Sequence, residues 1–198
     1  MKFIKENSYD IVRFFIYQLG IAVFSLTLAI PLETAVEDEQ TGAIVQFCVS
    51  LLAVAFYSVL VYTVSWDHGA TDRIRIDAGK TSYDPYKGAK IAILACVPNL
   101  LVSAVAIISA LLHSDGNAWT AVLGVTLMVL GLMESMYLGT VELISSLAVA
   151  GTQSFFIIKS ICFFVLPFVV VLSAHFGYAM GDKNKKIFGF LSNKKKKK

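Results

Sequence analysis

The chain has 198 residues, of which 57% are hydrophobic and only 16% are charged, and its formal net charge is +3. Soluble globular domains are roughly 45–50% apolar, so this composition, with a mean hydropathy of +0.70, excludes an ordinary soluble domain. Cys48, Cys96 and Cys162 lie in apolar runs without a CxxC spacing or a nearby histidine. They exclude a disulfide framework and are interpreted as small hydrophobic side chains.

The chain begins with a basic leader, MKFIKENSYDIVR, and continues with a charge-free run over residues 14–32. A hydrocarbon core about 30 Å thick needs about 20 helical residues, so this run predicts the first membrane span. We interpret it as an anchor and not as a cleaved signal peptide, because no Ala-x-Ala site precedes Glu33 and further apolar runs follow.

Two more apolar runs predict spans over residues 43–65 and 91–112, and a charged segment at 66–90 separates them. Glycines and a proline interrupt this segment, and RIRID alternates polar with apolar residues. The pattern favours a short hairpin or an irregular cap over a long helix.

The charged segment carries two weak chemical patterns. Gly79-Lys80-Thr81 lacks the upstream glycine of a phosphate-binding loop, since position 74 is Ile. Asp67, His68 and Asp72 are two carboxylates and one imidazole in a loop, which is too little to predict a metal site.

The C-terminal part predicts spans over residues 119–139, 140–158 and 160–180, followed by a basic tail at 182–198. The fold class is therefore all-α, a polytopic transmembrane bundle of six helices in a single domain, residues 1–181. The crossing at 140–158 has the weakest pattern, because it is short and polar. The alternatives are five spans, or four spans plus an interfacial or re-entrant helix.

Lys and Arg are retained on the cytoplasmic side of membrane proteins. Of the 17 in this chain, all but Lys159 lie in the leader, in 66–90 or in the tail, and the segments 33–42 and 113–119 have none. This predicts that both termini and 66–90 face the cytoplasm. An interfacial helix at 140–158 alone would leave the basic tail outside, which favours six crossings. Lys159 is expected to extend into the headgroups.

Small residues four positions apart allow helices to approach closely in lipid. Gly131, Ser135 and Gly139 have this spacing in the fourth span, and Gly177 and Gly181 have it in the last. Both sets are candidate packing faces. Pro98 and Pro167 are expected to kink their helices, and the Pro98-Asn99 pair slightly favours a polar pocket.

Glu134 and His175 are the ionisable residues most clearly inside predicted spans. Each lies fifteen residues from the external end of its span, Trp119 or Ser160, so both are expected at a depth of roughly 22 Å. An intramembrane carboxylate usually faces a partner or a wet cavity. The two residues are a candidate polar pair, and the alternative is that each extends separately to the cytoplasmic interface.

No protease or hydrolase motif is present in the sequence, and the adjacent His113, Ser114 and Asp115 are interpreted as a turn. We expect no catalytic residues, no enzyme activity, no cofactor, no metal and no nucleic-acid partner. The expected partners are the bilayer, its anionic lipids through 66–90 and the Lys tail, and another membrane protein. The first functional hypothesis is a non-enzymatic membrane component or accessory subunit. The alternative is a small transporter or its substrate-capturing subunit.

Three stretches, SWDHGATDRIRIDAGK, YKGAKIAILACVPN and FGYAMG, follow one another in this order along the chain. In this respect the chain resembles a family of small polytopic membrane proteins from Gram-positive bacteria that have no assigned function. The resemblance implies a multi-pass protein of a bacterial plasma membrane and implies no activity.

Overall fold

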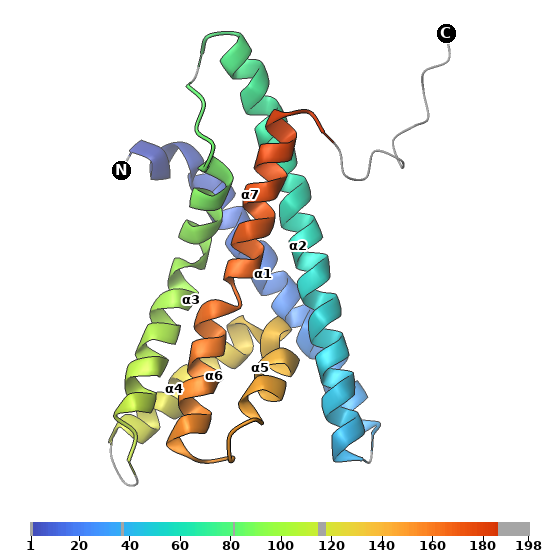
Figure 1. Ribbon diagram of the computed structural model, residues 1–198, viewed down its shortest axis with the longest axis vertical. Coiled ribbons are helices and arrows are strands. Elements are labelled where there is room, and N and C mark those ends of the chain that lie inside the picture. The colour runs from blue at the N-terminus through green and yellow to red at the C-terminus, as the bar shows by residue number, and fades with distance from the viewer. Residues whose placement is uncertain (1, 37, 81, 115–117, 186–198) are drawn as a thin grey trace.

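The computed structural model describes residues 2–36, 38–80, 82–114 and 118–185, and in these residues it has helices and turns but no β-strand. The predicted all-α helical bundle is therefore confirmed (Figure 1). The elements are α1 (Lys2–Thr34), α2 (Glu39–Asp77), α3 (Lys87–Leu111), α4 (Ala118–Met133), the 3₁₀ turn η1 (Ser135–Tyr137), α5 (Leu138–Ser145), α6 (Gln153–Val165) and α7 (Phe168–Asp182). One hydrophobic core joins them, because its buried side chains come from every α-helix.

Within the described residues, four stretches are long and apolar enough to cross a bilayer: Phe3–Leu32, Gln40–Asp77, Lys87–Leu111 and Gln153–Asp182. The last combines α6 and α7, which meet at Pro167, a residue without a backbone N–H to donate. Leu166 and Pro167 keep helical dihedral angles, so the two helices form one interrupted span. These stretches are compatible with a multi-pass membrane protein.

The charged segments gather at one end of the bundle. The start of α1, the α2–α3 connection and the end of α7 all lie there (Figure 1). The indole N–H of Trp66 donates to the carbonyl oxygen of Lys185 at 2.8 Å, which ties α2 to the residues after α7. We call this the charged end, defined by residues 2–13, 66–90 and 182–185. The other end, with the α1–α2, α3–α4 and α5–α6 connections, is the opposite end.

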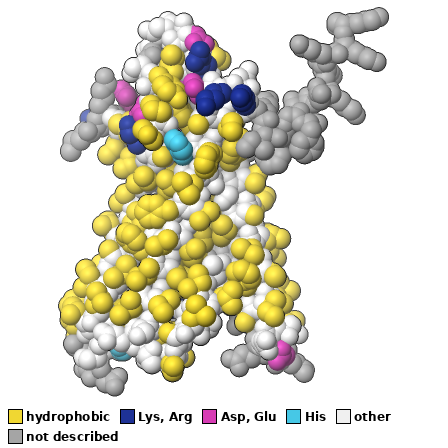
Figure 2. Space-filling view, in the orientation of Figure 1, with side chains coloured by type: hydrophobic (Ala, Val, Ile, Leu, Met, Phe, Trp, Pro, Cys, Tyr) yellow, Lys and Arg dark blue, Asp and Glu magenta, His cyan; other side chains and the backbone are white. Residues whose placement is uncertain are grey.

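Between the two ends, the surface is a broad belt of apolar side chains (Figure 2). Large apolar residues on every span are exposed, including Val23, Phe56, Leu101 and Leu172. Soluble proteins seldom expose apolar patches of this extent. The belt is the surface that a hydrocarbon environment would cover.

The charged segment at 66–90 was predicted to be a hairpin or an irregular cap, and this prediction was wrong for its first half. Residues 66–77 continue α2, which has 39 residues and is therefore about 58 Å long, roughly twice the hydrocarbon thickness. Arg73 pairs with Asp77 four residues later, and Arg75 lies 3.8 Å from Asp72 three residues earlier. Such pairs support a helix. The alternation in RIRID does not mark a strand, and its consequence is that the apolar Ile74 is exposed on the helix.

At the opposite end, α2 begins with an N-cap. The carboxylate of Asp38 accepts hydrogen bonds from the backbone N–H and the hydroxyl of Thr41, at 2.9 and 2.6 Å. These bonds satisfy a free donor of the first turn, and they hold the pKa of Asp38 below its usual value.

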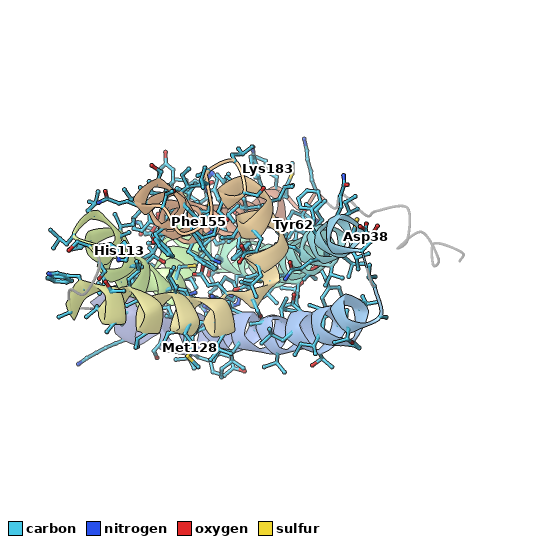
Figure 3. All side chains as sticks on the ribbon, turned by 90° about the horizontal axis from the view of Figure 1, so that it is seen from below. Asp38, Tyr62, His113, Met128, Phe155 and Lys183 are labelled. Atoms are coloured by element: carbon cyan, nitrogen blue, oxygen red, sulfur yellow. The ribbon has the colours of Figure 1, made fainter. Side chains whose placement is uncertain are left out.

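Residues 118–145 enter the bundle and return to the end where they began. The axes of Ala118–Met133 and Ser135–Ser145 differ in direction by 87°. At the start of α4, the Thr120 hydroxyl donates to the Ser114 carbonyl at 3.0 Å. At the start of α6, the Gln153 amide donates to the Leu111 carbonyl at 2.9 Å. Both bonds lie at the opposite end, where α4 packs on α3 and α1 (Figure 3), so α4, η1 and α5 form a re-entrant hairpin.

The prediction of six crossings therefore differs from the structure. The expected spans at 119–139 and 140–158 are replaced by this one hairpin, which leaves four spans. This is the predicted alternative of four spans plus a re-entrant helix, except that the re-entrant part starts at residue 118 and not at 140. Because two crossings are lost together, the end of α7 still reaches the charged end. The argument that a re-entrant helix would leave the basic tail on the outer side therefore does not apply.

Close backbone contact joins α2 and α7. A methyl group added at Gly177 would overlap the carbonyl oxygen of Tyr62, and one added at Gly181 would overlap that of Trp66. From the other side, Gly69 of α2 lies against the carbonyl oxygen of Tyr178. The predicted small-residue face of the last span is thus a tight contact, and Gly69 completes it.

The residues of the other predicted packing face, Gly131, Ser135 and Gly139, do not make the same kind of contact. Gly139 lies directly on the backbone of Gln46 in α2. The hydroxyl of Ser135 donates to the carbonyl oxygen of Ala22 in α1 at 2.6 Å. Gly131 makes no comparable contact, since an added methyl group would meet only the Leu138 side chain at 3.9 Å. The bend after Met133 separates these residues, so they do not share one helix face.

Replacing Gly177 with Ala should lower the melting temperature in detergent, because the new methyl group must displace the backbone of α2. Overpacking of this kind costs roughly 1–3 kcal/mol. Gly124→Ala is the matched control, because open space surrounds that position, and there the better helix propensity of Ala should leave stability equal or higher. Equal melting temperatures for the two variants would contradict the tight α2–α7 contact.

Candidate functional site

The hairpin bends where α4 gives way to the 3₁₀ turn. The N–H of Glu134 still bonds to the Leu130 carbonyl at 2.7 Å, whereas the Glu134 carbonyl accepts from Tyr137 at 2.8 Å, one residue too early for an α-helix. Glu134 itself has left the helical region, with φ −123° and ψ 27°. A break in regular bonding frees backbone carbonyl groups, and within an apolar bundle each must find another partner.

Serine hydroxyls from the neighbouring helices supply those partners. Ser50 of α2 donates to the Met136 carbonyl at 2.7 Å, and Ser25 of α1 lies 3.4 Å from the Ser135 carbonyl. Ser135 in turn donates to α1, through the carbonyl oxygen of Ala22. The bend is therefore anchored on two spans by side chain–backbone bonds.

The bend lies near the middle of the bundle. Ser50 comes eleven residues after Glu39, where α2 begins, which places it about 17 Å from the opposite end. Asn99, beside Glu134, is halfway along α3. For a hydrocarbon core about 30 Å thick, this is close to the midplane.

The side chain of Glu134 is fully buried, at 0% exposure. The Asn99 amide lies next to the carboxyl group but does not reach hydrogen-bond geometry. Neither carboxyl oxygen has a hydrogen-bond partner among the described residues. A buried carboxyl group without a donor is costly, because its lost hydration is not replaced.

Other buried polar groups surround this carboxyl group. The hydroxyls of Tyr57 and Tyr137 and the thiol of Cys96 lie within electrostatic range of Glu134. Ser103 is one helical turn beyond Asn99. Gln18 lies one helical turn after Phe14 and one turn before Ala22. The Phe14 carbonyl accepts from Tyr57, and the Ala22 carbonyl accepts from Ser135. We call the set the polar cluster: Gln18, Tyr57, Asn99, Ser103, Glu134 and Tyr137, each at most 2% exposed.

Many polar atoms of this cluster are unsatisfied. The Gln18 amide nitrogen, both side-chain polar atoms of Asn99, the Ser103 and Tyr137 hydroxyls and both Glu134 oxygens have no hydrogen-bond partner in the described part of the chain. Native proteins leave few such groups, and each calls for a reason. Because these groups lie on the helices that face Glu134, the polar cluster is the candidate binding site.

The structure does not bring the predicted pair, Glu134 and His175, together. The ring of His175 stacks on Tyr86, with ring centroids 5.6 Å apart, just before α3 begins. Asn99, beside Glu134, is thirteen residues further along the chain, which corresponds to about 20 Å of helix. Glu134 instead faces α3, α2 and η1.

The charged residues at the two ends make separate contacts. At the charged end, Asp72 accepts from Lys87 at 2.7 Å and from Tyr178 at 3.0 Å, which joins α2, α3 and α7. His68 lies 3.2 Å from Asp10 of α1, so it does not share a ligand set with Asp72. Among the described residues, no group of three or more His, Cys, Asp or Glu is arranged to hold a metal ion.

Lys159 was expected to extend into the headgroups, but in the structure its ammonium group pairs with the carboxylate of Glu142. This ion pair joins α6 to α5, the returning arm of the hairpin. Its partner is therefore within the protein.

No protein-family model, no curated protein and no solved structure matches the chain. The resemblance to membrane proteins of Gram-positive bacteria stays a prediction. The evidence for a function is therefore the geometry of the polar cluster.

The sequence singled out Glu134 as an intramembrane carboxylate but missed most of its surroundings. Gln18, Tyr57 and Ser103 are single polar residues in apolar runs, a pattern that is common in membrane helices. Asn99 carried a weak signal, since it follows Pro98. Their convergence depends on helix rotation, which hydropathy does not report.

Replacing Ser50 with Ala should destabilise the protein, because the Met136 carbonyl would lose its donor at the bend. An unsatisfied buried acceptor costs roughly 1–3 kcal/mol, measured as a fall in melting temperature in detergent. Ser173→Ala is the control, because that hydroxyl bonds only to the Val169 carbonyl of its own helix. If both variants lost the same stability, the serine anchor at the bend would be contradicted.

Proposed function

We propose that the chain is a multi-pass protein of a bacterial plasma membrane and acts as a small transporter, or as the substrate-capturing subunit of one. The polar cluster is its binding site. One observation carries this proposal: Glu134 is buried at the bend of a re-entrant hairpin, and its carboxyl oxygens have no hydrogen-bond partner among the described residues.

Two physical arguments support transport over a purely structural role. Ionisable side chains at membrane depth are costly and usually mark a pathway or a binding site. Helices interrupted near the midplane form the substrate and ion sites of many transporters, and here both the hairpin and the α6–α7 span are interrupted. A non-enzymatic accessory subunit, the first hypothesis from sequence, would not need an unpartnered carboxyl group. The proposed role is binding and passage, without a catalytic step.

A route toward the cluster begins at the interruption of the last span. A narrow apolar groove, closed to water in the structure, lies between α3 and the α6–α7 junction, lined by Ile93, Cys96, Leu100, Pro167, Phe168 and Val171. Cys96 is both in this groove and in electrostatic reach of Glu134. Movement of α7 about Pro167 would widen the groove and admit water to the cluster.

The proposed orientation places the charged end in the cytoplasm, which agrees with the retention of Lys and Arg on that side. Anionic lipids are proposed as partners of this end. Arg73, Lys87 and Lys90 are already paired with aspartates, so much of the attraction would come from the tail. Lys194–Lys198 lie outside the described residues.

A transport site must open to water at some stage, and Cys96 reports this opening. With Cys48 and Cys162 replaced by Ser, Cys96 should react in native membranes with a small cationic methanethiosulfonate reagent. Thiol reactivity depends on access and on the thiolate fraction. The control keeps Cys162 as the sole cysteine, because it is buried at 9% exposure but lies in α6, outside the polar cluster.

We expect Cys96 to react about tenfold faster than Cys162, because only Cys96 becomes accessible to water. Modification is followed by mass spectrometry of the intact protein. Equal inertness of the two thiols would contradict a site that opens during transport.

A further inference from the structure

Glu134 has no basic partner in the described part of the chain. The basic side chains within or next to the spans make other contacts: Arg13 donates to Tyr17, Lys159 pairs with Glu142, and His175 stacks on Tyr86. The titratable groups that face Glu134 are Tyr57 from α2, Cys96 from α3 and Tyr137 from η1, and none of them is a cation. An ionised carboxylate at this position would therefore lack a counter-charge from the protein.

The unsatisfied atoms around Glu134 are mainly oxygens. They are the Asn99 amide oxygen, the hydroxyls of Ser103 and Tyr137 and the carboxyl oxygens themselves, and the amide nitrogens of Gln18 and Asn99 are the two nitrogens among them. Oxygen donors of this kind suit protons and hard metal cations. The C-terminal end of α4, which stops at Met133, adds partial negative charge at the same place and disfavours an anion.

The site is also small. Asn99, Ser103 and Glu134 are all 0% exposed, and the groove beside Cys96 is lined by apolar side chains and not by the oxygens of the cluster. A bulky organic cation would need the core to be rebuilt, and close-packed interiors resist that. A bare ion needs only the displacement of a few side-chain atoms.

We infer that the polar cluster binds one small monovalent cation, a proton or a sodium ion. Glu134 supplies the negative charge, and Asn99, Ser103 and Tyr137 supply neutral oxygens. This inference rests on the proposed function, because it names the ion that the transport site takes. Occupancy neutralises the carboxylate and favours the closed cluster seen here, whereas an empty, ionised site favours entry of water and widening of the groove beside α7.

The test measures melting temperature of the full chain in mild detergent from acidic to alkaline pH, in sodium chloride or an equal concentration of choline chloride. A sodium site predicts a rise of about 3–6 °C when sodium is tenfold above its Kd. A proton site predicts that melting temperature falls as pH rises, equally in both salts. Glu134→Gln, a neutral isostere, should abolish either dependence of the melting temperature.

Glu142→Gln is the control, because Glu142 pairs with Lys159 at the edge of the hairpin, and it should keep the wild-type dependence on pH or sodium.

A second measurement needs no variant. A hydrophobic carbodiimide couples to protonated carboxyl groups in apolar surroundings, so it should modify Glu134 in the wild-type protein, with sodium slowing the reaction if sodium is the ligand. The inference is overturned if melting shows no Glu134-dependent effect of pH or sodium and if the carbodiimide does not modify Glu134. If Cys96 reacts but Glu134 responds to neither ion, the transport proposal stands and the cation inference fails. If Glu134 responds but Cys96 stays inert, the cation is structural and the transport proposal fails.

Discussion

A helix that breaks inside an apolar bundle must find new partners for its backbone polar groups, and this requirement governs the structure around residue 134. Ser25 and Ser50 donate to carbonyl groups of the bend, and Ser135 returns a bond to α1. Because these bonds are available, α4 can stop at Met133 and the chain can turn by 87°. The hairpin then returns to its own end, the last span runs toward the charged end, and Glu134 is held near the midplane.

The same bend separates satisfied backbone from unsatisfied side chains. The carbonyl groups at Ser135 and Met136 have donors, whereas Glu134, Asn99 and Tyr137 have buried polar atoms that find no partner in the described part of the chain. A purely structural bend would need only the first set. The second set is what supports a binding role, and its position beside an interrupted span supports a path by which an ion reaches it. The bend can be held rigidly while the site beside it adapts. This is because α1 and α2 anchor the bend, whereas α3 and α7 border the site.

The sequence was sufficient for the fold class and for four of the spans, because long charge-free runs report which segments prefer an apolar environment. It favoured six crossings and kept four spans plus a re-entrant helix only as an alternative, because residues that enter the membrane and return are as apolar as residues that cross it. The sequence placed Glu134 inside a span, either paired with His175 or extending to the cytoplasmic interface. Depth along a span carries no information on rotation, so the sequence did not predict that this side chain is buried beside Asn99. The spacing of Gly177 and Gly181 predicted a real contact. Gly131 failed because the bend turns it away from Gly139. The helical start of 66–90 was missed because ion pairs three and four residues apart outweighed its alternation.

Single-cysteine labelling can distinguish a re-entrant path of residues 118–145 from two full crossings. In a chain whose three native cysteines are replaced by Ser, new cysteines at Ser114, Leu138 and Val149 are exposed to an impermeant maleimide in intact cells and in inverted vesicles. Leu138 begins α5 near the bend, and Val149 is 75% exposed in the α5–α6 connection. The account predicts that positions 114 and 149 are labelled from the outer side and that position 138 is protected from both sides. Labelling of position 138 from the cytoplasmic side, with position 149 protected, would contradict the hairpin and restore six crossings.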